Sequence, residues 1–251
     1  MKLACITGAS SGIGREFARR LDAEGYNLIL VARSENKLKE IADACANSCR
    51  IVTADLSNRE ECMKLGEELA KEPLDIFINN AGFGCVEDFD ASDLENDLKM
   101  IDVNVEALQI LFRKVLPGFI ARDAGIILNV ASSAGLLYGG AYMATYYATK
   151  AYVTSLTSAV YQELKTRGSH VKVCMLCPGP VDTNFNNVAN SKFALKGISA
   201  EYCVDYALKK MKQGKLTIVP GNIVRAGVTF GKFLPRKMQL AIVQHQQSKK
   251  R

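Results

Sequence analysis

Three tyrosines in the sequence are each followed four residues later by a lysine: Tyr146 by Lys150, Tyr161 by Lys165 and Tyr206 by Lys210. On a helix, residues i and i+4 lie on the same face, so each lysine can stand next to its tyrosine. A nearby ammonium group favours the phenolate and lowers the tyrosine pKa from its usual value of about 10. Such a tyrosine can donate a proton to the alkoxide that forms when a carbonyl accepts hydride.

The surrounding sequence separates the first pair from the other two. Tyr146 follows an apolar run that ends in Ser132 and Ser133, and catalytic groups of parallel α/β sheets gather at the carboxyl ends of strands. A serine placed there can hydrogen-bond the substrate oxygen and stabilise its negative charge. Tyr161 would lie roughly 22 Å farther along the same helix, at ~1.5 Å per residue, and no serine-bearing strand end precedes Tyr206. The sequence therefore predicts the first pair as the proton-transfer site.

A glycine-rich turn follows the first apolar run, with the sequence Thr7-Gly8-Ala9-Ser10-Ser11-Gly12-Ile13-Gly14. Its three glycines permit a tight turn and let backbone N–H groups approach a pyrophosphate closely. The helix that begins next would point its positive end toward the anion. The spacing is G-x-x-x-G-x-G, which differs from the ordinary Rossmann pattern G-x-G-x-x-G. We expect the phosphates of a dinucleotide at this turn.

The residues after the second apolar run indicate which dinucleotide binds. An acidic side chain there would bind the adenosine 2′-hydroxyl and repel a 2′-phosphate. The chain instead has Val31-Ala32-Arg33-Ser34, without a carboxylate. Because the planar guanidinium of Arg33 suits a phosphate, the sequence predicts NADP(H) rather than NAD(H).

Apolar runs alternate with amphipathic stretches along the chain, which predicts a parallel sheet covered by helices on both faces. The expected strands are residues 3–6, 27–32, 50–53, 76–79, 126–130, 171–176 and 216–219. The expected helices are residues 14–24, 36–46, 59–72, 94–121, 146–167 and 200–213. These elements predict a doubly wound α/β fold of the Rossmann type with seven strands. No linker or repeat divides the sequence, so we expect one catalytic domain over residues 1–251.

Composition argues against several other classes. The chain has 251 residues, of which 48% are hydrophobic and 23% charged, which fits one large α/β domain. No run approaches the ~18 apolar residues of a membrane span, and no signal-peptide pattern is present, so we expect a cytoplasmic protein. The net charge is +6, but its basic residues are scattered and concentrate only at residues 246–251. We expect no nucleic-acid partner.

The eight cysteines are widely spaced, and we expect them to be reduced. Cys174 and Cys177 are the one suggestive pair, but both lie in the apolar run 171–177, which is typical of a buried strand, where residues three apart point to opposite faces. With only two histidines in the chain, we expect no metal site.

Four motifs stand in a fixed order over nearly the whole chain: Thr7-Gly8-x-x-x-Gly12-x-Gly14, Asn79-Asn80-Ala81-Gly82, Tyr146-x-x-x-Lys150 and Pro178-Gly179. Together they resemble the short-chain dehydrogenase/reductase family, in its branch of about this length. The resemblance implies an oxidoreductase that moves hydride between NADP(H) and a small-molecule carbonyl or secondary alcohol. A non-enzymatic NADP-binding regulator would have lost the proton donor, and an epimerase or dehydratase of the longer branch would differ in length and glycine spacing.

The resemblance also implies roles for individual residues. Asp55 and Leu56 would contact the adenine, Asn80 would stabilise the central sheet beside the cofactor ribose, and Thr183 would hold the nicotinamide carboxamide. The other implied cofactor contacts are Gly8, Ser10, Ser11, Gly12, Ile13, Gly14, Arg33, Ala81, Gly82, Tyr146, Lys150, Pro178, Gly179 and Val181. The family's usual basic residue before the second glycine is replaced by Ser11. The NADP(H) prediction therefore rests mainly on Arg33.

For the catalytic serine the resemblance gives two answers. The family's Ser-x-x-Gly pattern selects Ser132, through Gly135, whereas its usual spacing of thirteen residues to the tyrosine selects Ser133. We expect Ser132 and assign the extra residue to the loop at 136–141. Asn104 resembles the family's fourth catalytic residue, which would hold a water that passes protons to the lysine. The expected catalytic set is Asn104, Ser132, Tyr146 and Lys150.

Members that resemble this sequence commonly pair through two long helices, here 94–121 and 146–167, so we expect a homodimer or homotetramer. Apolar residues of these helices could form the interface or could equally face the sheet: Val105, Leu108, Leu111, Phe112, Val153, Leu156 and Val160. Residues 180–199 are polar and without periodicity, and a loop of that length is usually functional. We expect a substrate lid there, with Phe185 and Phe193 forming part of an apolar pocket.

The segment 223–251 interleaves apolar residues with Lys232, Arg236 and Lys237. In one interpretation its apolar residues close over the substrate pocket or fill a subunit interface. In the other, a helix over 235–247 lies on an anionic membrane. Because the polar face of that helix is largely uncharged glutamine, we expect the first interpretation and no membrane partner.

Overall fold

Seven parallel strands form the central sheet of the computed structural model, which describes residues 1–183 and 197–248. In spatial order they are β3 (Cys49–Thr53), β2 (Asn27–Ala32), β1 (Leu3–Thr7), β4 (Ile76–Asn79), β5 (Ile126–Val130), β6 (Lys172–Leu176) and β9 (Thr217–Ile218). All seven predicted strands are confirmed, with bounds that differ by at most one residue. The order reverses between β1 and β4, and such a switch point is where open α/β sheets bind ligands.

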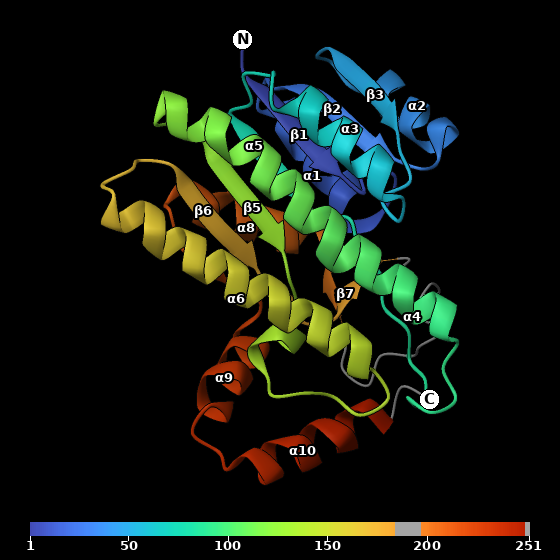
Figure 1. The fold of residues 1–251 in the computed structure, drawn as a ribbon. Helices are drawn as coiled ribbons and strands as arrows, with labels where there is room; N and C mark the ends of the chain where they lie inside the picture. Colours follow the sequence, from blue (N-terminus) through green and yellow to red (C-terminus); the bar gives the residue numbers. More distant parts are fainter. Residues whose placement is uncertain (184–196, 249–251) are drawn as a thin grey trace.

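Helices cover both faces of the sheet (Figure 1). One layer contains α1 (Gly12–Ala23), α2 (Glu35–Asp43) and α8 (Ala200–Lys212), and the other contains α3 (Arg59–Leu69), α5 (Leu108–Arg122) and α6 (Ala144–Thr166). Because strand side chains alternate between faces, Ile6 and Leu30 pack under the first layer, whereas Cys5 and Val31 pack under the second. The predicted doubly wound α/β fold is confirmed.

The long helix expected over 94–121 is present but is interrupted. It consists of α4 (Leu94–Ile101), a π-helical turn over Asp102–Ala107, and α5. A π-helical turn widens the helix by one residue and often marks a functional site. Asn104 lies within this turn and is fully buried.

The apolar residues that were weighed for a subunit interface mostly face inward. Leu108, Leu111 and Phe112 of α5 and Val153 of α6 are all buried in the core. These four residues therefore stabilise the fold, whereas Val105, Leu156 and Val160 are partly exposed. The expected pairing through these helices loses part of this support and stays a prediction.

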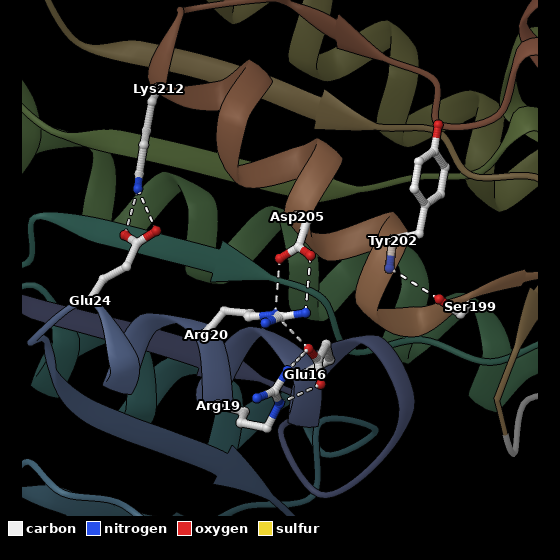
Figure 2. Close-up of polar contacts among 8 residues, drawn as sticks. All are labelled: Glu16, Arg19, Arg20, Glu24, Ser199, Tyr202, Asp205 and Lys212. Atoms are coloured by element: carbon white, nitrogen blue, oxygen red, sulfur yellow. Dashed lines mark hydrogen bonds and ion pairs between the residues drawn. The ribbon is translucent and has the colours of Figure 1, made fainter.

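Ion pairs between charged side chains connect α8 to α1 and to the residue that follows α1 (Figure 2). The Arg20 guanidinium donates from Nη2 to Asp205 Oδ2 at 3.0 Å, and Lys212 Nζ donates to Glu24 Oε1 at 2.6 Å. Ser199 caps α8, because its Oγ accepts a hydrogen bond from the N–H of Tyr202 at 3.2 Å. The start of α8 is thereby held in place.

A short parallel ladder that the sequence did not predict lies directly before α8. It joins β7 (Val181–Asp182) to β8 (Ile198–Ser199). The ladder pairs Val181 with Ile198 and Asp182 with Ser199. Most of the predicted lid at 180–199, including Phe185 and Phe193, lies outside the described residues.

The chain after the sheet forms two more helices, α9 (Asn222–Gly231) and α10 (Arg236–Ser248). The helix expected over 235–247 is confirmed, whereas α9 was not predicted. Both lie at one end of the molecule, beyond the carboxyl ends of the strands (Figure 1). Among the helices of the described residues, none has the length and apolar character needed to cross a bilayer.

The two cysteines of the suggestive pair pack on different sides of the sheet. Cys174 belongs to the core under α8, and Cys177 belongs to a separate cluster with Met175 and Val219. Burial raises the pKa of each thiol to about 12. All eight cysteines are free, and the described residues contain no group of three or more His, Cys, Asp or Glu that could hold a metal.

Candidate active site

A cavity of about 970 Å³ opens at the carboxyl ends of the strands. Its wall includes the β1–α1 turn, the ends of β2 to β6, and parts of α9 and α10. Of the residues that the sequence singled out, all line this cavity except Gly14 and Asn104. The fold therefore brings residues from the whole length of the chain to one site.

The glycine-rich turn forms an open cradle at one end of the cavity. Gly8 and Gly12 have φ values of +64° and +53°, which side chains rarely adopt. A Cβ at Gly8 would lie 2.9 Å from the Cα of Ala81, and one at Gly12 would lie 3.2 Å from the Cβ of Thr183. The first N–H groups of α1 receive no side-chain cap from Ser11, so an anion can bind them.

Asn80 stabilises this cradle from the neighbouring strand. Its Nδ2 donates to the carbonyl of Thr7 at 2.9 Å, and its backbone N–H donates to Thr7 Oγ1 at 2.9 Å. Gly14, in contrast, packs against this amide, since a Cβ there would lie 2.6 Å from Asn80 Nδ2. Close packing of α1 therefore requires a glycine here, and the expected cofactor contact of Gly14, which does not line the cavity, stays a prediction. The remaining cradle residues fit the pyrophosphate of a dinucleotide.

Two cations lie at the far end of the cavity, near the end of β2. Arg33 was expected, and Lys37 in α2 also lines the cavity. Asp55 lies nearby, and its Oδ1 accepts two hydrogen bonds from Ser57. The Ser57 N–H donates at 3.0 Å and the Ser57 hydroxyl donates at 2.8 Å. The backbone bond from Ser57 is the largest effect that lowers the Asp55 pKa, and the charge of Arg33 adds to it. The sequence did not indicate a role for Lys37, because this residue lies one helical turn beyond the strand end rather than at it.

Ser132 and Tyr146 meet at the centre of the cavity. Ser132 follows β5, and Tyr146 lies in the first turn of α6. The two side chains share a hydrogen bond that lowers the Tyr146 pKa. Ser132 Oγ also accepts from the N–H of Ala134 at 3.1 Å, whereas Ser133 donates its own N–H to the carbonyl of Pro178 at 2.8 Å. The geometry favours Ser132 over Ser133 as the partner of the tyrosine.

Burial controls the acidity of both members of the tyrosine–lysine pair. It raises the pKa of Tyr146 to about 12 and lowers that of Lys150 to about 8. Lys150 Nζ lies 5.9 Å from the centre of the Tyr146 ring and donates to the carbonyl of Val130 at 3.0 Å. The net shift of the Tyr146 pKa is thus opposite to the expected lowering, because desolvation by burial is the largest effect on this phenol.

The side chain of Asn104 joins the cavity wall to α6 from behind. Its Oδ1 accepts from the N–H of Phe83 at 3.0 Å, and its Nδ2 donates to the carbonyl of Phe83 at 2.8 Å and to Thr149 Oγ1 at 3.1 Å. Both the oxygen and the nitrogen of the Asn104 side-chain amide form hydrogen bonds. A water held by this residue would therefore have to bind its backbone carbonyl. Gly82 lies between the side chains of Asn104 and Lys150. A Cβ on Gly82 would lie 2.8 Å from Asn104 Oδ1 and 3.1 Å from Lys150 Nζ.

The apolar wall of the cavity comes largely from residues that sequence reasoning did not assign. It includes Leu137, Met143, Tyr147, Val228, Leu234, Ile242 and Val243. Gln239 holds α10 in place, because its Oε1 accepts from the N–H of Tyr138 at 2.8 Å and its Nε2 donates to the carbonyl of Gly231 at 3.1 Å. At the end of α10, Gln247 donates to the hydroxyl of Tyr147. The expectation that the C-terminal segment closes over the pocket is confirmed.

Comparison with known proteins agrees with this arrangement. The sequence model of the short chain dehydrogenase family matches residues 2–194. An uncharacterized oxidoreductase of Staphylococcus epidermidis is 35% identical over 185 residues, which cover 72% of this chain and 79% of that protein. The very-long-chain 3-oxoacyl-CoA reductase of Rattus norvegicus is 31% identical over 242 residues, which cover 93% of this chain and 75% of the relative.

Solved structures give the same result at the level of the fold. A short-chain dehydrogenase from Sphingobium yanoikuyae in complex with NADPH is 28% identical, with a TM-score of 0.83, over 93% of this chain and 94% of its own. A short chain dehydrogenase/reductase from Burkholderia phymatum in complex with NAD has a TM-score of 0.84 at 24% identity, over 95% of each chain. Because these two neighbours bind different dinucleotides, the structural similarity does not indicate which dinucleotide this chain prefers.

Proposed function

The chain belongs to the short-chain dehydrogenase family of oxidoreductases, and from that premise we propose that it transfers hydride between NADP(H) and a carbonyl or secondary alcohol. The hydrogen bond between Ser132 and Tyr146, inside a cavity that begins at the glycine cradle, carries this proposal. The hydroxyl groups stand where a substrate oxygen can bind, and the cradle stands where a pyrophosphate can bind.

The roles of the side chains follow from their positions. NADPH, when bound, supplies the hydride. The Tyr146 hydroxyl donates its proton to the substrate oxygen as negative charge develops there, and the Ser132 hydroxyl hydrogen-bonds the same oxygen. The buried Lys150 ammonium stabilises the phenolate that Tyr146 becomes. Asn104 and Thr149 act as positioning residues, because they hold α6 and the Phe83 backbone together.

The raised pKa of Tyr146 keeps this residue in the phenol form in the cofactor-free site. With a pKa of about 12 the phenol keeps its proton at neutral pH, and the protonated form is the one that donates in carbonyl reduction. Its acidity still exceeds that of an ordinary alcohol, so transfer to an alkoxide is favourable.

The preference for NADP(H) rests on Arg33 and Lys37, both of which line the adenosine end of the cavity. We expect Arg33→Asp to shift the ratio of kcat/KM for NADPH over NADH by more than about tenfold, since the attraction of one guanidinium for phosphate becomes repulsion. Arg113→Asp, an equal charge change on the exposed side of α5, is the control. Equal efficiency with the two cofactors in the unmodified protein would contradict the preference.

We propose an apolar ketone as the substrate class, because aliphatic side chains and Tyr147 dominate the wall opposite the cradle. The similarity to a very-long-chain 3-oxoacyl-CoA reductase supports this class. The test is NADPH oxidation with a panel of 3-oxoacyl thioesters, steroid ketones, short-chain ketones and ketosugars. We expect the fastest turnover with the first two groups. Turnover with ketosugars alone would contradict the proposal.

We further propose that the enzyme is cytoplasmic and forms a homodimer or homotetramer. Its eight free cysteines support a reducing compartment. Light scattering at micromolar concentration tests the assembly, and a monomeric mass would contradict it.

A further inference from the structure

The last helix has two of its four glutamines buried against the protein. Gln239, Val243 and Gln247 are its buried residues, and they lie at successive i, i+4 positions on one face. Met238, Leu240 and Ile242 are exposed instead. Gln239 and Gln247, which in the sequence argued for a weakly polar outer face, are used for internal hydrogen bonds, whereas Gln244 is exposed. The outer side of α10 is therefore more apolar than its sequence suggests.

Large exposed apolar side chains gather along α9, the turn after it and α10. These residues, which we call the C-terminal apolar surface, are Ile223, Phe230, Phe233, Met238, Leu240 and Ile242. Phe230 is 71% exposed and Phe233 is 83% exposed, so two whole aromatic rings stand in water. Concentrated exposure of this kind marks a surface that another apolar body covers.

The same part of the chain is exclusively basic. From Leu216 to Arg251 it contains seven Lys or Arg residues and no Asp or Glu. This segment carries a charge of +7, whereas the preceding residues together carry −1. Within the described residues, none of Arg225, Lys232, Arg236 and Lys237 forms an ion pair with a carboxylate. Within the described residues, these four cations lie on or directly beside α9 and α10.

Two kinds of body could cover such a surface, and the charges decide between them. A second copy related by a two-fold axis would place the same basic residues opposite one another, which repels. An anionic bilayer offers apolar depth for the rings and phosphates for the cations. We propose that α9 and α10 dock on an anionic lipid surface, with Phe230 and Phe233 inserted and Lys232 and Lys237 at the headgroups.

This docking would place the cavity beside the lipid. α9 and α10 line the cavity through Val224, Val228 and Val243. Of the C-terminal apolar surface, Ile223 and Ile242 also lie at the cavity, whereas Phe230, Phe233, Met238 and Leu240 lie outside it. An apolar compound dissolved in the bilayer would then be concentrated next to the cavity wall. The docking itself does not depend on the proposed oxidoreductase activity.

Sedimentation with vesicles tests the proposal in the full-length protein. We expect binding to vesicles of equal parts phosphatidylcholine and phosphatidylglycerol, none to phosphatidylcholine alone, and release at high salt. The double variant Phe230→Ser, Phe233→Ser should lose more than about tenfold in partition coefficient, because two large apolar side chains no longer insert. The double variant Lys232→Gln, Lys237→Gln should lose roughly 25-fold in partition coefficient, at roughly fivefold for each basic residue.

Matched variants elsewhere separate docking from general effects of charge and hydrophobicity. Phe89→Ser removes another exposed phenylalanine, but from a loop that also carries Glu87, Asp90 and Asp93. Lys209→Gln with Lys215→Gln removes two exposed lysines from and after α8. We expect both controls to bind like the unmodified protein, and circular dichroism checks that every variant folds.

Three results would overturn the proposal. The first is absence of salt-sensitive binding to the anionic vesicles. The second is equal binding by the two surface variants and the two controls. The third is an oligomer that the Phe230→Ser, Phe233→Ser variant dissociates while no form of the protein binds vesicles, which would make the surface an interface between copies.

Discussion

Two tyrosine–lysine pairs in this chain have the same spacing and the same separation. Tyr146 with Lys150 on α6 and Tyr206 with Lys210 on α8 each place the lysine Nζ 5.9 Å from the tyrosine ring centre. The surroundings of the two pairs differ. Lys150 is buried and donates to a strand carbonyl, whereas Lys210 is half-buried and donates to Gln213 Oε1 at 3.1 Å.

The hydroxyl groups of the two tyrosines differ in the same way. The Tyr146 hydroxyl bonds with Ser132 inside the cavity, and the Tyr206 hydroxyl accepts from Arg225 Nη1 at 2.6 Å outside it. Tyr161, the third candidate, packs half-buried against the core and does not line the cavity. Helical spacing therefore sets only which residues are neighbours. The strand end and the cavity decide which neighbours can meet a substrate.

Removal of the two hydroxyls should have the most unequal effects. Tyr146→Phe should lower kcat by on the order of 10²-fold or more, because it removes the general acid. Tyr206→Phe loses only a surface contact with Arg225, so we expect a change within about twofold. Steady-state NADPH oxidation with a ketone measures both, and cofactor fluorescence should show nearly unchanged NADPH binding. A Tyr146→Phe enzyme with more than about a tenth of the normal rate would contradict the comparison.

The hydrogen bond with Ser132 distinguishes Tyr146 from Tyr206. Removal of the Ser132 hydroxyl should have the next largest effect on kcat. Ser132→Ala should lower kcat by roughly 10²-fold, since a donor to the developing negative charge is lost. The Ser133→Ala variant keeps its backbone hydrogen bond to Pro178, so its kcat should fall by less than about threefold. Kinetic parameters of the two single variants check this order. The reverse order would assign the catalytic role to Ser133.

The two lysines should also differ in their effect on turnover. Lys150→Met removes the charge that stabilises the Tyr146 phenolate, so we expect kcat to fall by about tenfold or more. Lys210→Met removes a half-exposed lysine and should leave kcat within about twofold of normal. Denaturant unfolding of both variants is needed beside the kinetics, because Lys150→Met also leaves the carbonyl of Val130 without its donor. Equal losses in the two variants would contradict the comparison.

The smallest expected effect is on the pH dependence of stability. Burial lowers the Lys150 pKa from 10.5 to about 8, so between these values the unfolded chain holds a proton that the folded chain has released. The contribution of Lys150 to the free energy of unfolding should therefore rise with pH in this window, whereas the buried cysteines, whose pKa values are raised from 9.0, contribute a fall. The slope against pH should be more positive in the unmodified protein and in Lys210→Met than in Lys150→Met.

Measurements for this test should stay below pH 10. Tyr146 has the opposite sign, because its folded pKa is raised from 10 to about 12 and its contribution falls above pH 10. Urea unfolding of the cofactor-free protein between pH 8 and pH 9.5 gives the slope, in a range set by the lowered Lys150 pKa. An identical slope in all three proteins would show that Lys150 is not the group that titrates.

The sequence predicted the parts of the site that depend on local pattern. Apolar runs located every strand of the sheet, and glycines at positions 8 and 12 located the cradle, because only glycine tolerates those φ values without strain. Strand ends then brought Arg33, Asp55, Asn80 and Ser132 to one edge of the sheet. These residues needed no information beyond fold class and position along a strand.

The parts that could not be predicted depend on contacts between distant residues. Gln239 bonds a loop 101 positions away, and Gln247 bonds Tyr147 across 100 positions. Nothing in the local sequence of α10 indicates that its glutamines turn inward. The burial that raises the Tyr146 pKa is likewise a property of the assembled cavity, so helical spacing alone gave the wrong direction for this shift.

The path of the hydride is the most direct measurement of the central claim, that this site reduces a carbonyl with NADPH through Tyr146. The protein is incubated with an apolar ketone and NADPH that carries deuterium at the transferable C4 position, and the alcohol is examined by mass spectrometry and NMR. We predict deuterium at the carbinol carbon, formed at equal rates by the unmodified protein and Tyr206→Phe, and nearly absent with Tyr146→Phe. Alcohol without deuterium, or deuterated alcohol formed equally fast by Tyr146→Phe, would contradict the account.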